Sequence, residues 1–228
     1  NDDTLMELYF DKGTLDEDEM RRGLKIGMRL GDVVPVFCLS ARYDMGSGRM
    51  MGFIDNVAPS ATEMPGEKTV EGKDVAPSAE GPVRLLVFKT LAEHHLGRLS
   101  FFKVMSGTLS GGMELTAHGG QDAERLTQLF IADGQRRNAV QRLKAGDLGC
   151  TLKLKTVRTG DTLNGPGAEG SLAPFVFPAP KVRTAVSAAN KADEDKLSGV
   201  LEEIRTEDPT LRVEYNQELS QIILHGQG

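Results

Sequence analysis

The sequence has no tryptophan and only two cysteines and four histidines among its 228 residues. Cys38 and Cys150 lie far apart inside apolar runs, so we expect two buried free thiols in a reducing compartment. No apolar run reaches the about 20 residues of a transmembrane helix, and the opening NDDTLMELYF lacks the basic start of a signal peptide. We therefore expect a cytoplasmic protein without a membrane segment. Because the first residue is not methionine, we also expect a piece of a longer chain.

Side-chain groupings that support catalysis or metal binding are also missing. The adjacent pair His94 and His95 has no cysteine or histidine at zinc spacing, so we expect no metal site. Asp147 and Asp161 each follow a glycine, a pattern typical of tight turns, and neither has a nucleophile or a histidine at a recognisable spacing. The sequence thus predicts no catalytic residue and does not favour a free-standing metabolic enzyme.

Residues 190–193 read Asn-Lys-Ala-Asp and match the guanine-recognition motif N-K-x-D of GTPases. That function needs a buried strand before the motif, but the preceding segment VRTAVSA alternates. The phosphate-binding motif G-x-x-x-x-G-K-[ST] occurs nowhere in the chain. We interpret Asp193 instead as a residue at or near a helix N-cap, where a carboxylate accepts backbone N–H bonds.

Charge is unevenly distributed along the chain, whose net charge is −6. Residues 1–80 carry a net charge of −7, residues 81–178 of +4 and residues 179–228 of −3. The middle segment is therefore the one suited to a polyanion, although +4 is also an ordinary charge for a soluble segment of this length. Arg136 and Arg137 lie in a polar stretch of this segment, and the sequence leaves both phosphate contact and a solvated loop open.

The first part of the chain has the order helix, strand, helix. Thr14 and Glu17 have the spacing of a capping box and predict a helix start. The run VVPVFCLSA at residues 33–41 is typical of a strand covered on both faces in a parallel sheet. A helical repeat over residues 50–57 ends at Pro59. This order predicts the tail of an α/β domain.

Residues 59–82 contain four prolines and few large apolar side chains, which is typical of a linker or long loop. Over residues 83–177, short apolar segments are separated by turn signals such as Gly111-Gly112 and Asp133-Gly134. Strands at this spacing predict a closed β-barrel or a sandwich. The expected strands are VRLLVFKT, RLSFFKVMSG, MELTAHG, ERLTQLFI, LGCTLKLK and FVF.

The last part of the chain predicts a different module. VRTAVSAA is expected to form a strand, and an apolar stripe from Leu197 to Ile204 predicts a helix that Pro209 stops. Two further strands are expected around residues 211–215 and 220–226. The order β-α-β-β is the first part of a ferredoxin-like unit, which needs another helix and strand to be complete.

Three stretches in this order resemble bacterial translation elongation factor G. They are GRLSFFKVMSGTLSGG (97–112), LKAGDLGCTLKLKTVRTGDTLNGP (143–166) and KADEDKLSGVLEEIRTEDPTLRV (191–213). The resemblance runs from near Asp2 to Gly228 and implies a multi-domain fold. Its expected parts are the C-terminal tail of an α/β GTPase domain (1–62), a linker (63–81), an antiparallel β-barrel of the translation-factor domain II type (82–179) and a partial ferredoxin-like α+β domain III (180–228).

The resemblance also implies sites and partners. Ser40 and Ala41 match the family's guanine-contacting loop, and Arg98, Arg136 and Arg137 become candidate contacts to the ribosome and its RNA. GTP and Mg²⁺ would be the cofactors of a full-length GTPase. This chain, which lacks the phosphate-binding motif, is expected to bear no nucleotide chemistry alone. We expect a monomer whose partner is the ribosome.

Two functions remain open on this resemblance. The first is GTP-dependent translocation of tRNA and mRNA during protein synthesis. The second is that of a divergent paralogue acting in ribosome recycling, disassembly or protection. It is favoured by the segments AEHHLGR (92–98) and FIADGQRRNAV (130–140), which depart from the loops usual in the family, whereas the neighbouring strands and turns match better.

Overall fold

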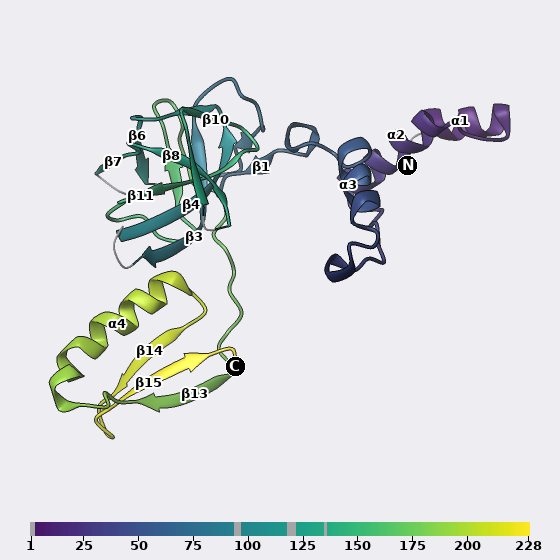
Figure 1. Ribbon diagram of the computed structural model, residues 1–228. Coiled ribbons are helices and arrows are strands. Elements are labelled where there is room, and N and C mark those ends of the chain that lie inside the picture. Colours follow the sequence, from purple (N-terminus) through teal and green to yellow (C-terminus); the bar gives the residue numbers. More distant parts are fainter. Residues whose placement is uncertain (1–2, 94–96, 118–121, 135) are drawn as a thin grey trace. The chain divides into compact units, whose positions relative to one another are not determined.

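The computed structural model describes residues 3–93, 97–117, 122–134 and 136–228. The chain divides into two compact units, Asn1–Gly66 and Glu67–Gly228. The first unit contains the purple and blue helices of Figure 1, and the second contains a β-barrel and a smaller α+β module. In the described parts of the chain, no helix combines the length and the apolar character needed to cross a membrane.

Three α-helices and two short 3-10 helices form the regular part of the first unit: α1 (Asp3–Lys12), α2 (Glu17–Leu30), η1 (Ala41–Tyr43), α3 (Ser47–Asn56) and η2 (Ala61–Glu63). The predicted helix over residues 50–57 is confirmed as α3. The capping box predicted at Thr14 and Glu17 is wrong by two residues. Asp16 is the N-cap of α2, its carboxylate accepts the Glu19 amide at 2.8 Å, and the Glu19 carboxylate accepts the Asp16 amide at 2.9 Å. Aspartate ranks above threonine as an N-cap, so the box forms at Asp16.

Residues 33–41, predicted as a buried strand, form neither a regular strand nor a core. Val34 is 78% exposed and Val36 is 88% exposed. A strand needs a hydrogen-bonded neighbour, and the described residues of the first unit contain no strand that could pair with this run. The prediction for Cys38 is therefore also wrong, because this thiol is exposed, whereas Cys150 is buried as expected.

The segment expected to be a linker contains a small hairpin. Strand β1 (Glu67–Lys68) pairs antiparallel with β2 (Asp74–Val75). Val75 is buried together with Leu172 and Met105, and Thr69 forms an antiparallel bridge with Leu172. These contacts attach the hairpin to the segment that follows the last barrel strand.

The barrel is one curled sheet of eight strands in the order β7-β6-β12-β3-β4-β11-β8-β9, with a two-stranded ribbon of β5 and β10 (Figure 1). Every pairing is antiparallel, which confirms the predicted architecture. Residues 175–177, predicted as a strand, lie outside the sheet. The strands are β3 (Arg84–Glu93), β4 (Gly97–Ser106), β5 (Thr108–Ser110), β6 (Glu114–Ala117), β7 (Ala123–Arg125), β8 (Leu129–Asp133), β9 (Arg136–Val140), β10 (Arg142–Lys144), β11 (Leu148–Leu152) and β12 (Thr162–Asn164).

The barrel encloses the main hydrophobic core. Phe102 and Val104 from β4 pack there with Leu85 and Val87 from β3 and with Leu163 from β12, and none of these five side chains is exposed to solvent. Burying an apolar side chain of this size contributes about 1.5–3 kcal/mol. The alternation of inward and outward residues in the strands thus gives the curled sheet an apolar inner face that packs around this core.

The α+β module has the predicted β-α-β-β order: β13 (Val182–Val186), α4 (Glu194–Glu207), β14 (Arg212–Asn216) and β15 (Gln221–Gly226). The strands form an antiparallel sheet in the order β13-β15-β14. Asp193 occupies the N-cap position of α4, but its side chain caps no amide and pairs with Lys196 at 3.0 Å. Its dihedrals, φ −103° and ψ −2°, differ from the extended conformation of a capping residue. Asp193 is also the last residue of the 3-10 helix η3 (Lys191–Asp193), which accounts for this difference.

Candidate functional site

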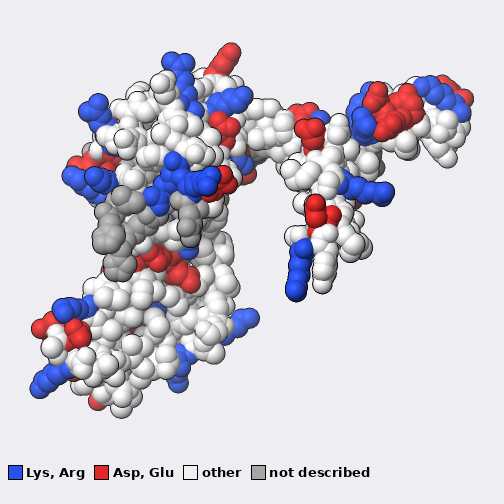
Figure 2. Space-filling model, in the orientation of Figure 1, with Lys and Arg blue, Asp and Glu red and all other residues white. Residues whose placement is uncertain are grey.

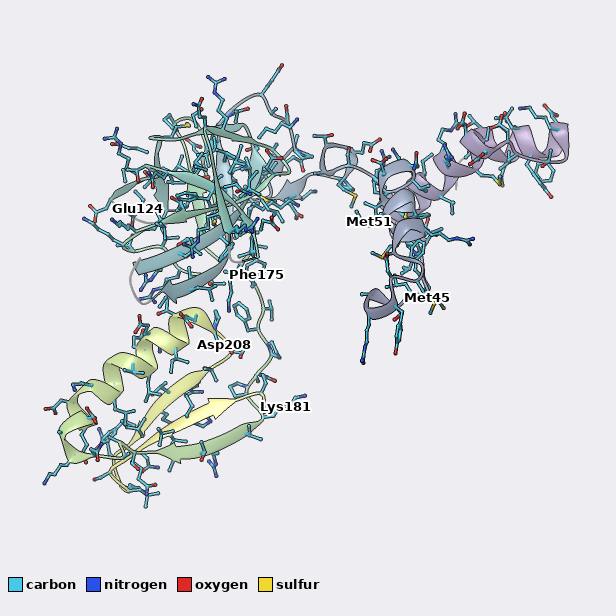
Figure 3. The ribbon with its side chains drawn as sticks, in the orientation of Figure 1. Met45, Met51, Glu124, Phe175, Lys181 and Asp208 are labelled. Atoms are coloured by element: carbon cyan, nitrogen blue, oxygen red, sulfur yellow. The ribbon has the colours of Figure 1, made fainter. Side chains whose placement is uncertain are left out.

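The loop that contains Ser40 and Ala41 closes on itself. The Ser40 amide donates to the carbonyl of Met45 at 2.9 Å, and the Met45 amide donates to the carbonyl of Ser40 at 3.0 Å. The helix η1 and Asp44, which has a positive φ of 49°, form the turn between them. Figure 3 labels Met45 in this loop. The loop is therefore a preformed turn in which both main-chain polar groups of Ser40 are already paired, while Ala41 is exposed.

Arg98 is held against the barrel. It lies on β4, it is half-buried, and its Nη1 donates to the carbonyls of Lys155 and Val157 at 3.4 Å each. These contacts tie the segment after β11 to β4. The structure thus places Arg98 in a local supporting contact, which distinguishes it from a fully solvated cation.

Arg136 and Arg137 lie at the start of β9, where they pair with Asp133 and Ala132 of β8. Arg136 is exposed and Arg137 is half-buried. In the sheet order, β11 and β8 separate β9 from β4, so Arg98 is not a sheet neighbour of this pair. Figure 2 shows the Lys and Arg side chains of the visible face in several groups rather than in one continuous patch.

A set of polar contacts that the sequence did not predict joins the barrel to α4. Lys89 Nζ donates to the carbonyl oxygen of Glu207 at 2.7 Å. Thr90 Oγ1 donates to the carbonyl oxygen of Thr206 at 2.8 Å and shares a second hydrogen bond with the Thr159 hydroxyl at 3.0 Å. Thr90 is completely buried. Two neighbouring residues of β3 therefore hold the last turn of α4.

The same helix end makes two further contacts. The Glu207 carboxylate accepts the backbone amide of Ala92 from β3. The Asp208 carboxylate accepts the Thr210 hydroxyl at 2.6 Å and the Thr210 amide at 3.0 Å (Figure 3). These bonds, with a smaller contribution from the nearby charge of Lys89, hold the pKa of Asp208 below its ordinary value. The turn after α4 therefore keeps an ionised carboxylate close to the ammonium group of Lys89.

A pocket of about 460 Å³ adjoins this junction. Its walls come from the barrel segment of Arg158, from the connecting residues 177–180, and from α4 and the turn after it. Arg205, which lines it, forms an ion pair with Glu202 at 2.9 Å. Because three parts of the chain share the wall, the pocket depends on the way in which the barrel and the α+β module are held together.

A buried carboxylate elsewhere in the barrel has a structural task. Glu124 on β7 is only 7% exposed (Figure 3). Its Oε1 accepts the amides of Lys155 and Thr156 at 2.9 and 2.8 Å and the Thr156 hydroxyl at 2.9 Å. Three donors on one carboxylate oxygen offset the cost of burying its charge. Glu124 thus fixes the loop after β11, the same loop that Arg98 contacts.

The sequence contains one signal for the junction, namely the end of the expected strand VRLLVFKT. Its apolar run stops at Phe88, and two polar residues follow where the strand is still paired. The partners Thr206 and Glu207 lie 116 and 118 residues further along the chain. Local patterns do not report a contact over such a separation, so the junction was missed.

Comparisons with known proteins identify the two modules of the second unit. The family model described as elongation factor G domain 2 matches residues 82–165, and the one described as elongation factor G, domain III, matches residues 177–228. Elongation factor G 1 from Syntrophomonas wolfei is 32% identical over 232 residues, which cover 100% of this chain and 34% of the relative.

A solved structure has the same fold. A crystal structure of a protein from Thermus thermophilus matches with a TM-score of 0.82 and 24% identity, over 100% of this chain and 32% of that one. The chain therefore spans about a third of the length of the relatives that it matches.

Proposed function

Because the chain belongs to the elongation factor G family, we propose that it works within a ribosome-associated translational GTPase that promotes GTP-dependent translocation of tRNA and mRNA. The observation that carries this proposal is the succession of the family's second and third domains in one chain. The relative that matches the whole chain is itself named an elongation factor. We further propose that the protein acts as a monomer in the cytoplasm, where ribosomes translate.

In this proposal the barrel docks on the ribosome through cationic side chains. Residues 81–178 carry the positive part of the chain's charge, +4, and Arg136 at the end of the β8–β9 hairpin is exposed. Phosphate contacts need accessible cationic donors and no particular base sequence. The third domain, held to the barrel at the end of α4, would then pass changes in nucleotide state onward as a rigid body.

GTP and Mg²⁺ would be the cofactors of such a GTPase. The part of this chain that resembles a nucleotide site is the exposed loop of Ser40 and Ala41, and the main-chain groups of Ser40 are paired within that loop. The chain contains no G-x-x-x-x-G-K-[ST] sequence that could hold phosphates. We therefore assign no step of nucleotide hydrolysis to residues of this chain.

Ribosome binding tests the docking role of the barrel. The substitution Arg136→Ala together with Arg137→Ala, made in the full-length protein, should weaken co-sedimentation with ribosomes. It should also reduce the slope of log affinity against log salt, by about 0.7–0.9 for each phosphate group that the variant no longer neutralises. Arg125→Ala, which removes an exposed arginine from the opposite edge strand β7, is the control and should change binding less. Binding that depends neither on salt nor on the double substitution would contradict docking through this hairpin.

The alternative is a role in ribosome recycling, disassembly or protection. It is favoured by the departures from the usual family loops at residues 92–98 and 130–140; of these residues, 94–96 and 135 lie outside the described part of the structure. Polypeptide synthesis and ribosome splitting, both measured with the full-length protein, separate the two roles. Support of elongation favours translocation. Splitting without elongation favours recycling, and ribosome binding with neither activity favours protection.

A further inference from the structure

The end of α4 cannot cap itself. The last carbonyl groups of a helix have no partner within the helix and are commonly satisfied by amides of the residues that follow. Here the Asp208 amide bonds the carbonyl of Ile204 at 2.9 Å, and Pro209 has no N–H to donate to the carbonyl of Arg205. The next two amides, of Thr210 and Leu211, bond the carboxylate and the carbonyl of Asp208 instead of the helix. The carbonyls of Thr206 and Glu207 therefore need donors from elsewhere.

The barrel provides these donors. Thr90 Oγ1 bonds the carbonyl of Thr206 at 2.8 Å, and Lys89 Nζ bonds the carbonyl of Glu207 at 2.7 Å. A cation at a helix C-terminus also interacts favourably with the helix dipole. We propose that Lys89 and Thr90 act as a latch that caps α4 from the barrel, so that the third domain has a complete helix only while it is docked.

A β-bulge places the latch. The pairing of β3 with β4 shifts register between Val87 and Lys89, which leaves Phe88 as the extra residue. Side chains alternate along a strand, so one inserted residue reverses the facing of all that follow. Val87 and Thr90 are completely buried, whereas Lys89 is partly exposed. Without the bulge, Lys89 would take an inward position and Thr90 an outward one, and the two donors would exchange faces.

The latch gives the junction two distinct states. When docked, the buried Thr90 hydroxyl has two partners, Thr206 and Thr159, and the α4 carbonyls are satisfied. When the third domain swings away, the last turn of α4 loses both donors and frays, because the amides of Thr210 and Leu211 are already bonded to Asp208. Movement of the third domain and the order of the last turn of α4 are thus coupled. This inference concerns contacts within the chain and does not depend on ribosome binding.

The test uses two substitutions in the 228-residue chain. Thr90→Val keeps the buried volume but removes the hydroxyl, and Lys89→Met keeps most of the apolar stem but removes the ammonium group. We expect each to speed amide hydrogen exchange in the last turn of α4, the double variant by roughly tenfold or more, because charge-assisted and buried hydrogen bonds are removed. Residual dipolar couplings of the barrel and of the β13–β15 sheet should then require separate alignment tensors, whereas the unaltered chain needs one.

Matched controls separate the latch from general destabilisation. Thr151→Val removes another completely buried barrel hydroxyl, which bonds the Gln128 carbonyl at 2.7 Å, and it should leave α4 exchange and the common tensor unchanged. Thr90→Ser keeps the hydroxyl and should restore both readouts. Faster exchange of the barrel amides in Thr90→Val would mean that this substitution destabilises the barrel itself. In that case the Lys89→Met variant alone tests the latch. Unchanged α4 exchange and a single tensor in the Lys89→Met variant would overturn the proposal.

Discussion

Asp147 and Asp161 perform the same task at two turns of the barrel. Asp147 accepts the amide of Lys144 at 2.8 Å, and Asp161 accepts the amide of Arg158 at 2.7 Å. The glycine before each aspartate has a positive φ, 95° in one case and 97° in the other. The predicted tight turns are confirmed, and the carboxylate of each aspartate holds its own turn.

Gly160→Ala tests the cost of this backbone conformation. An added Cβ would meet only Phe175, at an ordinary 3.7 Å, so the loss should come from strain at φ 97°. We expect the free energy of unfolding to fall by about 1–2 kcal/mol in chemical denaturation. Gly111→Ala is the control, because a Cβ there has similarly ordinary contacts at 3.7 and 3.9 Å and the φ is not positive. Equal effects at both positions would refute strain as the cause.

The helices of the first unit and its extended run at residues 33–41 depend differently on their surroundings. The helix α3 forms where the repeat predicts it, because its backbone hydrogen bonds are internal. The run at residues 33–41 has the stronger apolar signal, yet it forms no strand, since pairing must come from another strand. Element identity was therefore predictable for the helix and not for the strand.

A carboxylate joins two elements of this unit. The carboxylate of Glu63 in η2 accepts a hydrogen bond from the Ser60 amide at 2.7 Å and forms an ion pair with Lys25 of α2 at 3.1 Å. Hydrogen bonds from Ser60, followed by the bond from Lys25, lower the pKa of Glu63 from 4.5 to about 2. A carboxyl group with a lowered folded pKa contributes stability above pH 4.5, which is lost as the pH falls toward 2.

We expect the Glu63 side chain to titrate with a midpoint near pH 2 when its chemical shifts are followed by NMR. The substitution Lys25→Met should raise the midpoint only in part, because the two hydrogen bonds from Ser60 remain. The salt dependence of the titration should fall in the same variant, since the exposed ion pair is the screened component. A midpoint at 4.5 in the unaltered protein would show that the tie does not form in solution.

At the scale of the whole molecule, the chain carries family domains without the sequence that binds phosphates. The second unit has its own core, and the latch at the end of α4 joins its two modules. The nucleotide chemistry proposed for the full-length factor must then come from other residues.

Thermal unfolding of the 228-residue chain tests whether these residues bind GTP by themselves. A ligand that binds only the folded protein raises its stability by RT ln(1 + [L]/Kd). We expect no shift of the melting temperature with GTP and Mg²⁺, because Ser40 and Ala41 are not joined by a phosphate-binding motif. ATP with Mg²⁺ is the control for weak nonspecific effects. A shift with GTP that exceeds the shift with ATP would contradict the prediction.

Sequence alone determined the features that depend on neighbouring residues. The long barrel strands β3, β4 and β11, the two Gly-Asp turns and the β-α-β-β module follow from alternation, glycine dihedrals and helical periodicity, which act over a few residues. Strands β9 and β10 were not among the expected segments. Only the tertiary structure showed that residues 33–41 have no strand partner. It also showed that Arg98 supports a loop and that Lys89 and Thr90 contact the end of α4. The reason is physical, because the backbone preferences of a residue depend on its neighbours in sequence. A contact with a residue more than a hundred positions away forms only when the whole chain folds.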